Sequence, residues 1–593
     1  MPPVEHPAST PVRRRSALVH PTVLALAAAA VAAACVGDPE GDASTAGPSD
    51  PTVTAPTGPT AEDAATIEGS DLPTALACGE TRDVTVTVRN TGAATWTHDA
   101  HKLGAVGDED PLHPGDVRVW LPEGVEVLPG GVHDFTFPLV APSVAGTYRT
   151  DWQMVHEGVQ WFGETVGADV VVACDPVEAR TGVVSLDGNS LVDDQGLFNA
   201  VGATMFWAAW AYEHDRPKLE ANLAFLSTHG FRYIRALGVV GDPDRADFWD
   251  GREISASSPT WDATIAGLTD LVHDQYGMRI QWTLIGDGQV TVPTIDERYA
   301  LVDRFLAMSV GREEKIILFE IANEAWQNGF PGDDGIADLR ALSQYMKDRT
   351  DVMVSASAPE GHDCASAEAM YNGGVADMST PHFDREIGFV EGSWRPVRQP
   401  WEWEYCVDVP VGSNNEPIGP GSSVASEDDP VKLVAAAIDT FVANLPMYVY
   451  HTDAGVRGDT EIYDAPGADA FGHLADLVPG DLASWDRKNA HWADSPFAVY
   501  ATEGGQSYVD TMWVDLANPD SGAVRAYGDV SGDAFFVFPI GILGAVTMEA
   551  RRPMDLEVLD TMTGAFVSAH TLDAGEAIVL TGADTFVLRG TYR

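Results

Sequence analysis

The feature that most constrains the fold is a regular alternation of short apolar runs with helical patterns across the middle of the chain. The runs FRYIRAL, MRIQWTLIG and KIILFEIANE read as buried strands. The segments LEANLAFLSTHG and TIAGLTDLVHDQYG, which lie between such runs, carry apolar residues at helical spacing. About eight units of this kind would place parallel strands inside a ring of helices. We therefore predict a (β/α)8 TIM barrel over residues 178–480.

The segments on either side of this region show strands and turns without helical patterns. Residues 67–176 contain period-two runs such as DVTVTVRNTG, which predict an Ig-like β-sandwich. Residues 485–593 contain short runs such as AFFVFPIG, which predict a C-terminal β-sandwich. The chain is therefore expected to be a multidomain protein, with a central α/β barrel flanked by two all-β domains.

The N-terminal segment, residues 1–35, is a predicted targeting signal. Three arginines precede the apolar run VLALAAAAVAAA, whose 12 residues are too few to span a bilayer. Small residues before Cys35 resemble a bacterial lipobox, which implies lipidation of Cys35 and a place on the outer face of the cell membrane. The alternative is a cleaved secretory signal peptide. Residues 36–66 are rich in Pro, Ser, Thr and Gly and predict a disordered linker.

The charge balance excludes two classes of partner. The chain has 89 acidic and 35 basic residues, a net charge of −54. Nucleic acids and anionic membrane surfaces are both recognised by basic patches. We therefore expect no nucleic-acid partner, and membrane contact only through a lipid anchor.

The five cysteines fit an extracellular protein. If Cys35 carries lipid, four remain, and an even number suits disulfides in an oxidising compartment. Three connectivities are possible, and the pairs Cys78–Cys174 and Cys364–Cys406 keep each bridge within one domain. The sequence has no C-x-x-C or H-E-x-x-H spacing, so we expect neither a metal nor a cofactor.

Polar residues at the ends of apolar strands are the candidates for chemistry, because active sites of such barrels lie where the strands end. Asn323 and Glu324 end the fourth predicted strand, in KIILFEIANE. Glu416, in GSNNEPIGPG, ends the seventh. Strands four and seven lie across the barrel from each other, and two carboxylates about 5 Å apart are what retaining glycoside hydrolysis needs. If the seventh strand is misplaced, the rivals to Glu416 are Glu402, Glu404 and Asp408.

These motifs resemble those of the clan A glycoside hydrolases, in particular the cellulase and β-mannanase-like barrels. The resemblance covers the barrel and implies that Glu324, in ANEAW, is the acid/base and that Asn323 binds the substrate 2-hydroxyl. It implies that Glu416 is the nucleophile. Arg235, in YIRAL, would hydrogen-bond that nucleophile and keep it ionised. His382, in PHFDR, would lie near the same carboxylate.

Three further residues are predicted to bind substrate. Trp326 lies two residues beyond Glu324 and is the tryptophan that we expect to stack on a sugar. Tyr450 and His451, in YVYHT, stand where the family usually has a strand-eight tryptophan. Asp384 replaces the family's usual strand-six tyrosine. These departures leave the sugar and the linkage unidentified.

The N-terminal β domain contains four tryptophans that resemble the four-tryptophan Ig-like domain. That family has no catalytic residues, which implies a spacer or an interaction module that contacts protein or cell-wall material. We expect most of these tryptophans to pack in the core, and an exposed one to contact carbohydrate or protein. The residues are Trp96, Trp120, Trp152 and Trp161.

The function that these motifs predict is that of a secreted, surface-anchored retaining β-glycoside hydrolase acting on an oligo- or polysaccharide with two glutamates. The alternative is a non-catalytic carbohydrate-binding or cell-wall-associated protein on a degenerate glycosidase barrel. A third hypothesis is an adhesion protein whose Ig-like domain carries the function.

Overall fold

The structure, a computed structural model, describes most of the chain beyond residue 61. The described residues are 62–113, 117–142, 146–173, 178–361, 363–382, 397, 407–412, 430–465, 467–489, 495–501, 506–509, 512–514, 524–528, 532–539, 542–543, 545–581 and 586–593. The predicted targeting signal and Cys35 lie outside them, as do Cys174, Cys406 and Glu416. The disulfide pairing and the lipid anchor therefore stay predictions.

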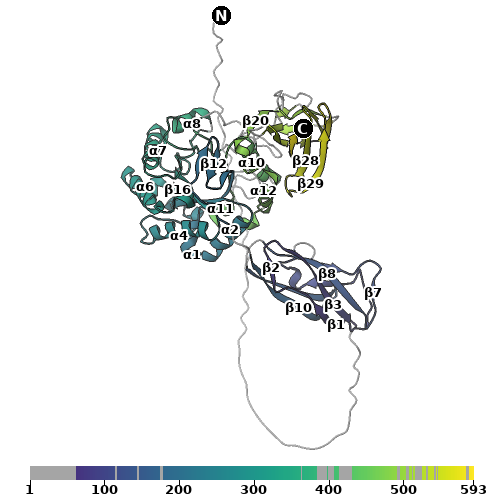
Figure 1. Cartoon of the computed structure of the whole chain (residues 1–593). Coiled ribbons are helices and arrows are strands. Elements are labelled where there is room, and N and C mark those ends of the chain that lie inside the picture. The colour runs from purple at the N-terminus through teal and green to yellow at the C-terminus, as the bar shows by residue number, and fades with distance from the viewer. Residues whose placement is uncertain are drawn as a thin grey trace, which may run out of the picture. The chain divides into compact units, whose positions relative to one another are not determined.

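The N-terminal β domain consists of two facing sheets around one core (Figure 1, purple to blue). Along β3 (Thr81–Asn90), Val84, Val86 and Val88 are buried while the residues between them are not, which is the alternation of a half-buried strand. One sheet has the order β1-β3-β8, with β1 (Ala65–Ser70) and β8 (Val132–Val140). The other has the order β2-β10-β9-β5-β6, with β2 (Ala75–Ala77), β10 (Gln160–Ala173), β9 (Gly146–His156), β5 (His101–Ala105) and β6 (Arg118–Trp120). β4 (Trp96–Thr97) pairs with β7 (Glu126–Val127).

The central domain contains a six-stranded sheet whose strands are all parallel, in the order β18-β17-β16-β15-β14-β19. Every residue of these strands is buried, as expected when both faces of a sheet are covered. The strands are β14 (Ala200–Thr204), β15 (Tyr233–Val239), β16 (Arg279–Ile285), β17 (Ile316–Ala322), β18 (Val354–Ser355) and β19 (Met447–Tyr450).

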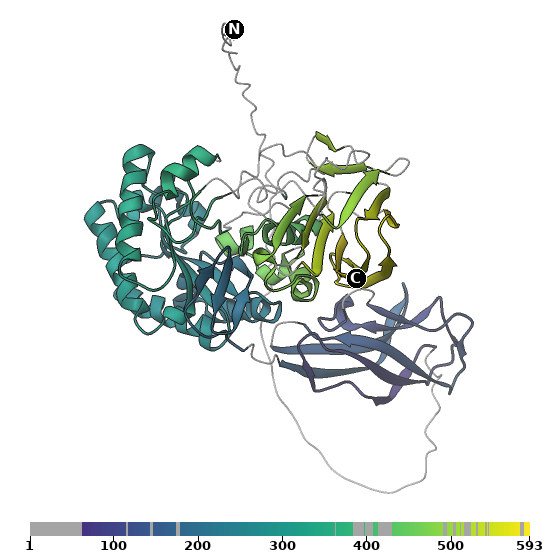
Figure 2. The ribbon, with the colours of Figure 1, turned by 45° about the horizontal axis from the view of Figure 1, so that its top comes forward.

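Helices follow most of these strands and lie outside them, as Figure 2 shows for the teal domain. The helix α6 starts at a capping box in which Thr294 and Glu297 satisfy each other's backbone N–H groups. The helices are α1 (Ala208–His214), α2 (Arg216–Thr228), α3 (Ala246–Trp249), α4 (Trp261–Asp274), α5 (Gly288–Thr291), α6 (Ile295–Ser309), α7 (Gly332–Lys347), α8 (Cys364–Tyr371), α10 (Val431–Val442), α11 (Asp453–Arg457) and α12 (Leu474–Leu477). A small antiparallel sheet precedes the parallel sheet, and its strands are β11 (Ser185–Asp187), β12 (Ser190–Asp193) and β13 (Gly196–Phe198).

Two short segments continue the parallel arrangement beyond β18. The N–H of Asp377 donates to the carbonyl of Val354 at 2.8 Å, and Ser379 forms a parallel bridge with Val411. These segments occupy the places expected for the sixth and seventh strands, and β19 beside β14 occupies the eighth. Within the described ranges no pairing joins residues 407–412 to β19. The structure thus shows a barrel-like α/β domain, and the closed TIM barrel stays a prediction.

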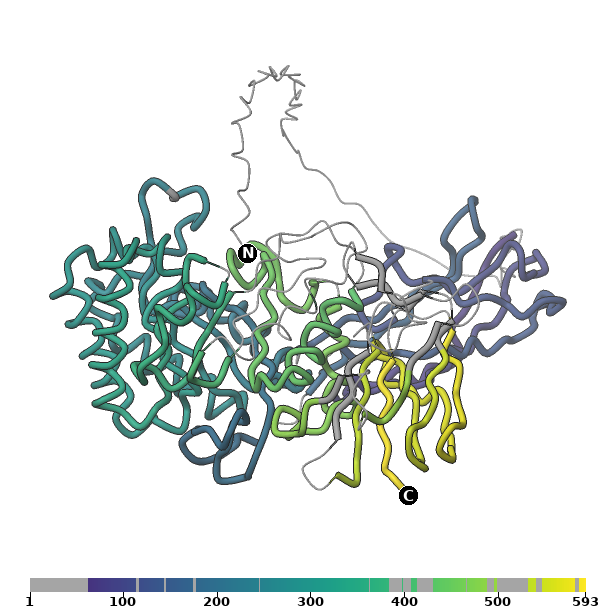
Figure 3. The backbone as a smooth tube through the Cα atoms, turned by 90° about the horizontal axis from the view of Figure 1, so that it is seen from above, coloured from purple at the N-terminus to yellow at the C-terminus, as the bar shows by residue number. Residues whose placement is uncertain are grey.

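The C-terminal β domain is built on a six-stranded antiparallel sheet (Figure 3, yellow at its end). Its order is β20-β24-β25-β31-β28-β29, with β20 (Asp486–Asn489), β24 (Val524–Gly528), β25 (Ala534–Pro539), β31 (Phe586–Tyr592), β28 (Met554–Asp560) and β29 (Phe566–Leu572). Two three-stranded sheets accompany it, formed by β21 (Phe497–Ala501), β27 (Ala545–Ala550) and β30 (Ala577–Thr581), and by β23 (Met512–Val514), β22 (Gln506–Val509) and β26 (Ile542–Leu543). No helix of the described ranges is long and apolar enough to cross a membrane.

Candidate active site at the strand ends

A pocket of about 200 Å³ opens where β15, β16 and β17 end in the central domain. Both polar residues that follow β17, Asn323 and Glu324, line it. This position explains why an apolar strand is followed by an amide and a carboxylate, because the end of the strand faces a cavity. The remaining lining residues are Phe206, Leu237, Val240, Phe248, Trp249, Gly286, Asp287, Gln327, Asn328, His451 and Val456.

Glu324 adopts an unusual backbone conformation. Its φ of 36° lies in the left-handed region, which costs a non-glycine residue on the order of 1 to 3 kcal/mol and is concentrated at functional sites. The side chain is 19% exposed. Its Oε2 accepts a hydrogen bond from Gln327 Nε2 at 3.0 Å, and its Oε1 lies 3.2 Å from His382 Nδ1. The carboxyl group is therefore held from two sides while it still reaches the pocket.

His382 is buried and is the partner that decides the electrostatics at Glu324. Burial lowers the pKa of His382, and the hydrogen bond with Glu324 opposes this shift without overcoming it. The imidazole is thus neutral at neutral pH, so Glu324 does not face a positive charge there. The resemblance implied that His382 lies near Glu416, whereas the contact that the structure shows is with Glu324.

Arg235, on β15, binds a carboxylate that the sequence analysis did not single out. Its Nε and Nη2 donate to Glu320 Oε2 at 3.2 and 2.9 Å, and both side chains are fully buried. Glu320 also accepts from Thr283 Oγ1 at 2.6 Å and from Thr380 Oγ1 at 2.8 Å. The signal in the sequence was a charged residue in the middle of the apolar strand IILFEIA.

Asn323 is oriented by the same arginine. Arg235 Nη2 donates to Asn323 Oδ1 at 2.8 Å. Because the amide oxygen is used in this way, the amide nitrogen of Asn323 is directed elsewhere, and an N–H donor of a pocket residue suits a substrate oxygen. Arg235 Nη1 is buried and has no hydrogen-bond partner among the residues that the structure describes.

A second strand-end carboxylate lines the pocket and was missed from the sequence. Asp287 follows β16, is buried and has a φ of 47°. Its Oδ2 accepts from Trp249 Nε1 at 2.9 Å and from the N–H of Gly241 at 3.2 Å. The stretch LIGDG shows the same pattern as IANE, which is a polar residue just beyond the end of a buried strand.

Asn328 joins these two strained positions. Its Oδ1 accepts from the backbone N–H of Asp287 at 2.6 Å, and its Nδ2 donates to the backbone carbonyl of Glu324 at 3.1 Å. One amide side chain therefore fixes both left-handed strand ends relative to each other. This kind of support is what holds a strained functional backbone in place.

The two residues predicted at the eighth strand, Tyr450 and His451, lie in different surroundings. His451 lines the pocket, and its Nδ1 lies 2.9 Å from Thr204 Oγ1. Tyr450 instead packs against Phe231 and Phe471, with ring centroids 6.2 and 4.9 Å away. Neighbouring residues of a strand point to opposite faces, so the two side chains cannot both reach the cavity. The structure does not bring Tyr450 to the pocket.

Trp326 and Asp408, which are both described by the structure, do not line this pocket. Trp326 is half-buried and is not among the lining residues. Asp408, a rival for the second carboxylate, accepts from the backbone N–H of Gly373 at 3.1 Å and does not line the cavity either. Glu416 lies outside the described residues, as do its rivals Glu402 and Glu404, so the separation of the two carboxylates stays a prediction.

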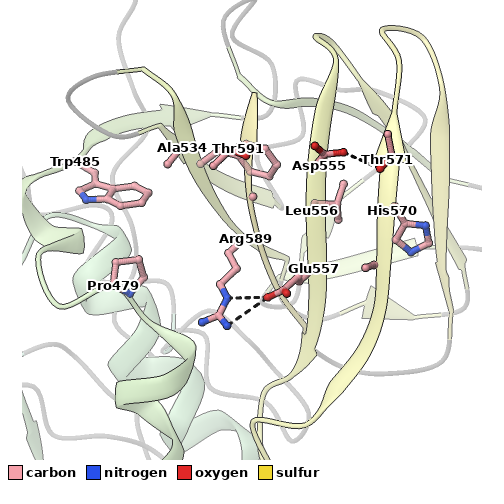
Figure 4. Close-up of a pocket in the computed structure, with 13 residues that line it drawn as sticks. Pro479, Trp485, Ala534, Asp555, Leu556, Glu557, His570, Thr571, Arg589 and Thr591 are labelled. Atoms are coloured by element: carbon pink, nitrogen blue, oxygen red, sulfur yellow. Dashed lines mark hydrogen bonds and ion pairs between the residues drawn. The ribbon is translucent and has the colours of Figure 1, made fainter. Parts of the chain in front are cut away.

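A larger pocket, of about 670 Å³, involves the C-terminal β domain (Figure 4). Its polar side chains pair with one another, since Arg589 Nε lies 3.3 Å from Glu557 Oε2 and Thr571 Oγ1 donates to Asp555 at 2.7 Å. None of the residues predicted to act in catalysis lines it. Because it contains no carboxylate at the end of a parallel strand, we place the candidate active site at the smaller pocket.

One cluster in the N-terminal β domain has the residue types of a metal site, namely Asp63, His101 and His156. Hydrogen bonds explain why these three side chains lie together. Asp63 lies 3.1 Å from His101 Nε2 and 2.8 Å from His156 Nδ1, and His101 Nδ1 accepts from the N–H of Thr97 at 3.3 Å. This last bond leaves the proton of His101 on Nε2, where it is donated to Asp63.

Comparison with known proteins identifies the N-terminal β domain. Residues 73–172 match the family model described as the Ig-like domain from next to BRCA1 gene. The predicted Ig-like domain is thereby confirmed. Of its four tryptophans, Trp96 and Trp152 are fully buried, whereas Trp120 and Trp161 are 43% and 36% exposed. A comparison with curated proteins found no match.

Glycoside hydrolases are among the solved structures that this chain is similar to. A proposed glycoside hydrolase from Bacteroides vulgatus is 11% identical, with a TM-score of 0.45, over 88% of this chain and 100% of its own. A GH30 endoxylanase from Clostridium papyrosolvens is 10% identical, with a TM-score of 0.38, over 71% and 100%. A β-mannanase from Streptomyces thermolilacinus is 15% identical, with a TM-score of 0.32, over 46% and 84%. Because these TM-scores lie below 0.5, we base the proposed function on the site.

Proposed function

We propose that the protein is a β-glycoside hydrolase that cleaves an oligo- or polysaccharide, with Glu324 as the proton donor. The observation that carries this proposal is the setting of Glu324, a strained strand-end residue that lines a pocket and contacts a buried, neutral histidine. A general acid must hold its proton until the leaving oxygen takes it. A cation beside Glu324 would favour its ionised form, and the neutral His382 avoids that.

The pocket offers groups that suit a sugar. Trp249, Phe206 and Phe248 supply aromatic surface, and the amide of Asn323 is oriented by Arg235 so that its nitrogen can donate to a substrate hydroxyl. Ligand sites of this kind combine apolar walls with a few positioned polar groups. His451 adds a further polar side chain at the wall.

We propose Glu416 as the nucleophile of a retaining mechanism. Glu416 would attack the anomeric carbon while the carboxyl group of Glu324 protonates the leaving oxygen, and water activated by Glu324 would then release the sugar. Two observations support this choice. Val411, close before Glu416 in sequence, forms a parallel bridge with Ser379. Arg235 Nη1 is a buried donor without a partner in the described part of the chain, and a carboxylate would satisfy it.

Glu320 does not compete for the nucleophile's role. It is fully buried, does not line the pocket, and already accepts hydrogen bonds from Arg235, Thr283 and Thr380. A carboxylate that is surrounded by donors inside the sheet cannot approach an anomeric carbon. Its role is to hold Arg235 beneath Asn323.

The proposal is tested by replacing the proton donor. Glu324→Gln keeps the shape of the side chain but removes the proton, so turnover of glycosides with poor leaving groups should fall by about 10²- to 10⁴-fold. Glycosides with activated nitrophenol leaving groups should be less affected in the bond-cleaving step, because they need no protonation. Rates would be measured for both substrate types across gluco, manno, xylo and galacto sugars.

The matched control is Glu368→Gln, which makes the same change on the exposed surface of α8. It should leave both rates unchanged. If Glu324→Gln retained full turnover of poor-leaving-group substrates, Glu324 would not be the acid. If the native protein bound these sugars without cleaving any, the alternative of a carbohydrate-binding protein would replace the enzyme.

We further propose that the protein acts outside the cytoplasm, anchored to the cell membrane by lipid on Cys35. The support is the run of small residues before this cysteine and the linker that follows it. Fatty-acid labelling of the native protein and of Cys35→Ser in a bacterial host tests this anchor, and label that persists in the variant would rule it out.

A further inference from the structure

We propose that the N-terminal Ig-like domain has a binding face for a neutral polysaccharide, formed by Trp120 and Trp161 on the five-stranded sheet. The ligand class rests on the glycosidase function proposed above, whereas the site itself rests on the arrangement of these two indoles. The two tryptophans are among the exposed large apolar residues of the structure, while the other two tryptophans of this domain are buried.

Strand pairing places both indoles on one face of the sheet. Trp120 on β6 pairs with Lys102 on β5, Lys102 pairs with Val155 on β9, and Val155 pairs with Trp161 on β10. Residues paired across neighbouring strands point to the same face. Three strand spacings of roughly 4.8 Å separate the backbone positions of the two tryptophans by about 14 Å, but the Trp161 ring reaches across the sheet to Gly104 on β5, so the indoles lie closer to each other than their backbones do. Two exposed indoles on one face suit a chain of sugars better than a single sugar ring.

Each indole is fixed before any ligand arrives. The Nζ of Lys102, a buried residue, lies 3.6 Å from the centroid of the Trp120 ring, and the His98 ring lies 5.1 Å from it. The guanidinium of Arg118 lies 4.9 Å from the Trp161 ring. Cation–π contacts of this kind restrain a side chain that would otherwise lose rotamer freedom on binding.

Gly104 lets the Trp161 ring lie close to the sheet. A Cβ at this position would be 2.8 Å from Trp161 Cη2 and 3.2 Å from Arg118 Nη1, which is closer than such atoms approach. Lys102 and Val155, which lie between the two tryptophans in the strand register, are buried. Both indoles therefore contact β5, Trp120 at Lys102 and Trp161 at Gly104, and form two aromatic surfaces on one face.

The charges of this face are balanced, which selects the class of ligand. Arg118 is paired with Asp108 and with Glu157, and Lys102 Nζ lies 3.5 Å from Glu157. A face whose cations are already paired, on a chain with a net charge of −54, offers no attraction to anionic polymers. The same ion pairs present donors and acceptors to sugar hydroxyls beside rings that can stack on sugar C–H groups. A neutral polysaccharide fits both properties.

Binding by the full-length chain tests the proposal. Glu324→Gln serves as the parent, so that the polymer is not degraded, and its retention on microcrystalline cellulose, insoluble mannan and insoluble xylan would be measured. Adding Trp120→Ala and Trp161→Ala should weaken retention on at least one of these polymers by about tenfold or more. In the chain with Glu324 intact, the two changes should leave turnover of a small aryl glycoside unaltered.

Phe566→Ala is the control, because it removes another exposed aromatic side chain, from β29 of the C-terminal β domain. It should leave retention unchanged, and melting curves should show that all variants fold. Equal retention of the parent and the double tryptophan variant, or no retention of the parent on any polymer, would overturn the proposal. If the double tryptophan variant lost binding to phosphatidylcholine vesicles but not to any of the polymers, the proposal would be overturned too, and a membrane-contacting face would be indicated. Failure of the glycosidase function would show separately, as unchanged turnover in Glu324→Gln.

Discussion

At the scale of single residues, the site depends on buried groups that are paired with each other. Glu320 lies in the middle of β17 and neutralises Arg235, which in turn fixes the amide of Asn323 at the pocket. A buried ion pair contributes little net stability when intact, but removal of one partner leaves the other charge without compensation. The position of Asn323 therefore depends on the Arg235–Glu320 ion pair, which does not line the pocket itself.

This dependence predicts the effect of Glu320→Gln. Arg235 would keep its charge in a fully buried place, so the free energy of unfolding should fall by about 3 to 5 kcal/mol. The matched control is Glu557→Gln, which breaks an ion pair with Arg589 whose side chains are 49% and 41% exposed, and it should cost no more than about 1 kcal/mol. Denaturant unfolding measures both. Equal, small losses in the two variants would show that the buried pair does not support the site.

At the scale of elements, the order of strands and helices followed from the sequence because buried parallel strands are continuous apolar runs and their helices repeat with a different period. The residues of the site could be predicted from the sequence only in part. The pattern of a polar residue after an apolar strand predicts Asn323 and Glu324 as site residues. The same pattern occurs at Asp287, which was not predicted because it belongs to no family motif. The structure places all three residues at one pocket.

What the sequence could not decide was which side a residue faces and which partner it takes. Tyr450 and His451 are adjacent, and only the register of β19 determines that His451 reaches the pocket. Arg235 and Glu320 belong to strands far apart in sequence, and their contact appears only once β15, β16 and β17 are aligned. Likewise, the four tryptophans of the Ig-like domain looked alike until strand pairing separated two buried from two exposed.

At the scale of the whole molecule, two buried and two half-buried histidines favour the folded state only while they are neutral. Burial lowers the pKa of His101, His133, His229 and His382 from the ordinary value of 6.5. The unfolded chain takes up these protons near pH 6.5, whereas the folded chain takes them up only at lower pH. The stability that they contribute is therefore fully present above pH 6.5 and is lost as the pH falls below it.

We therefore expect the melting temperature to fall as the pH is lowered from 7.5 to about 5.5. Few carboxylates titrate in this range, so relief of repulsion within the acidic chain should not mask the effect, and added salt would screen what repulsion remains. Calorimetry at several pH values measures the trend. A melting temperature that rises steadily as the pH is lowered over the same interval would contradict the assignment of these histidines as neutral in the folded state.

The central claim is that Glu324 and Glu416 together cleave a glycosidic bond with a covalent intermediate. The most direct measurement is the intact mass of the native protein after incubation with 2-fluoro-glycosides of the gluco, manno, xylo and galacto series, followed by peptide mapping. We predict a mass gain of one fluorosugar from at least one series, located on the peptide that contains Glu416 and absent in Glu416→Ala. An adduct on another carboxylate, or rapid turnover of an unmodified glycoside with no adduct from the matching fluorosugar, would contradict this account.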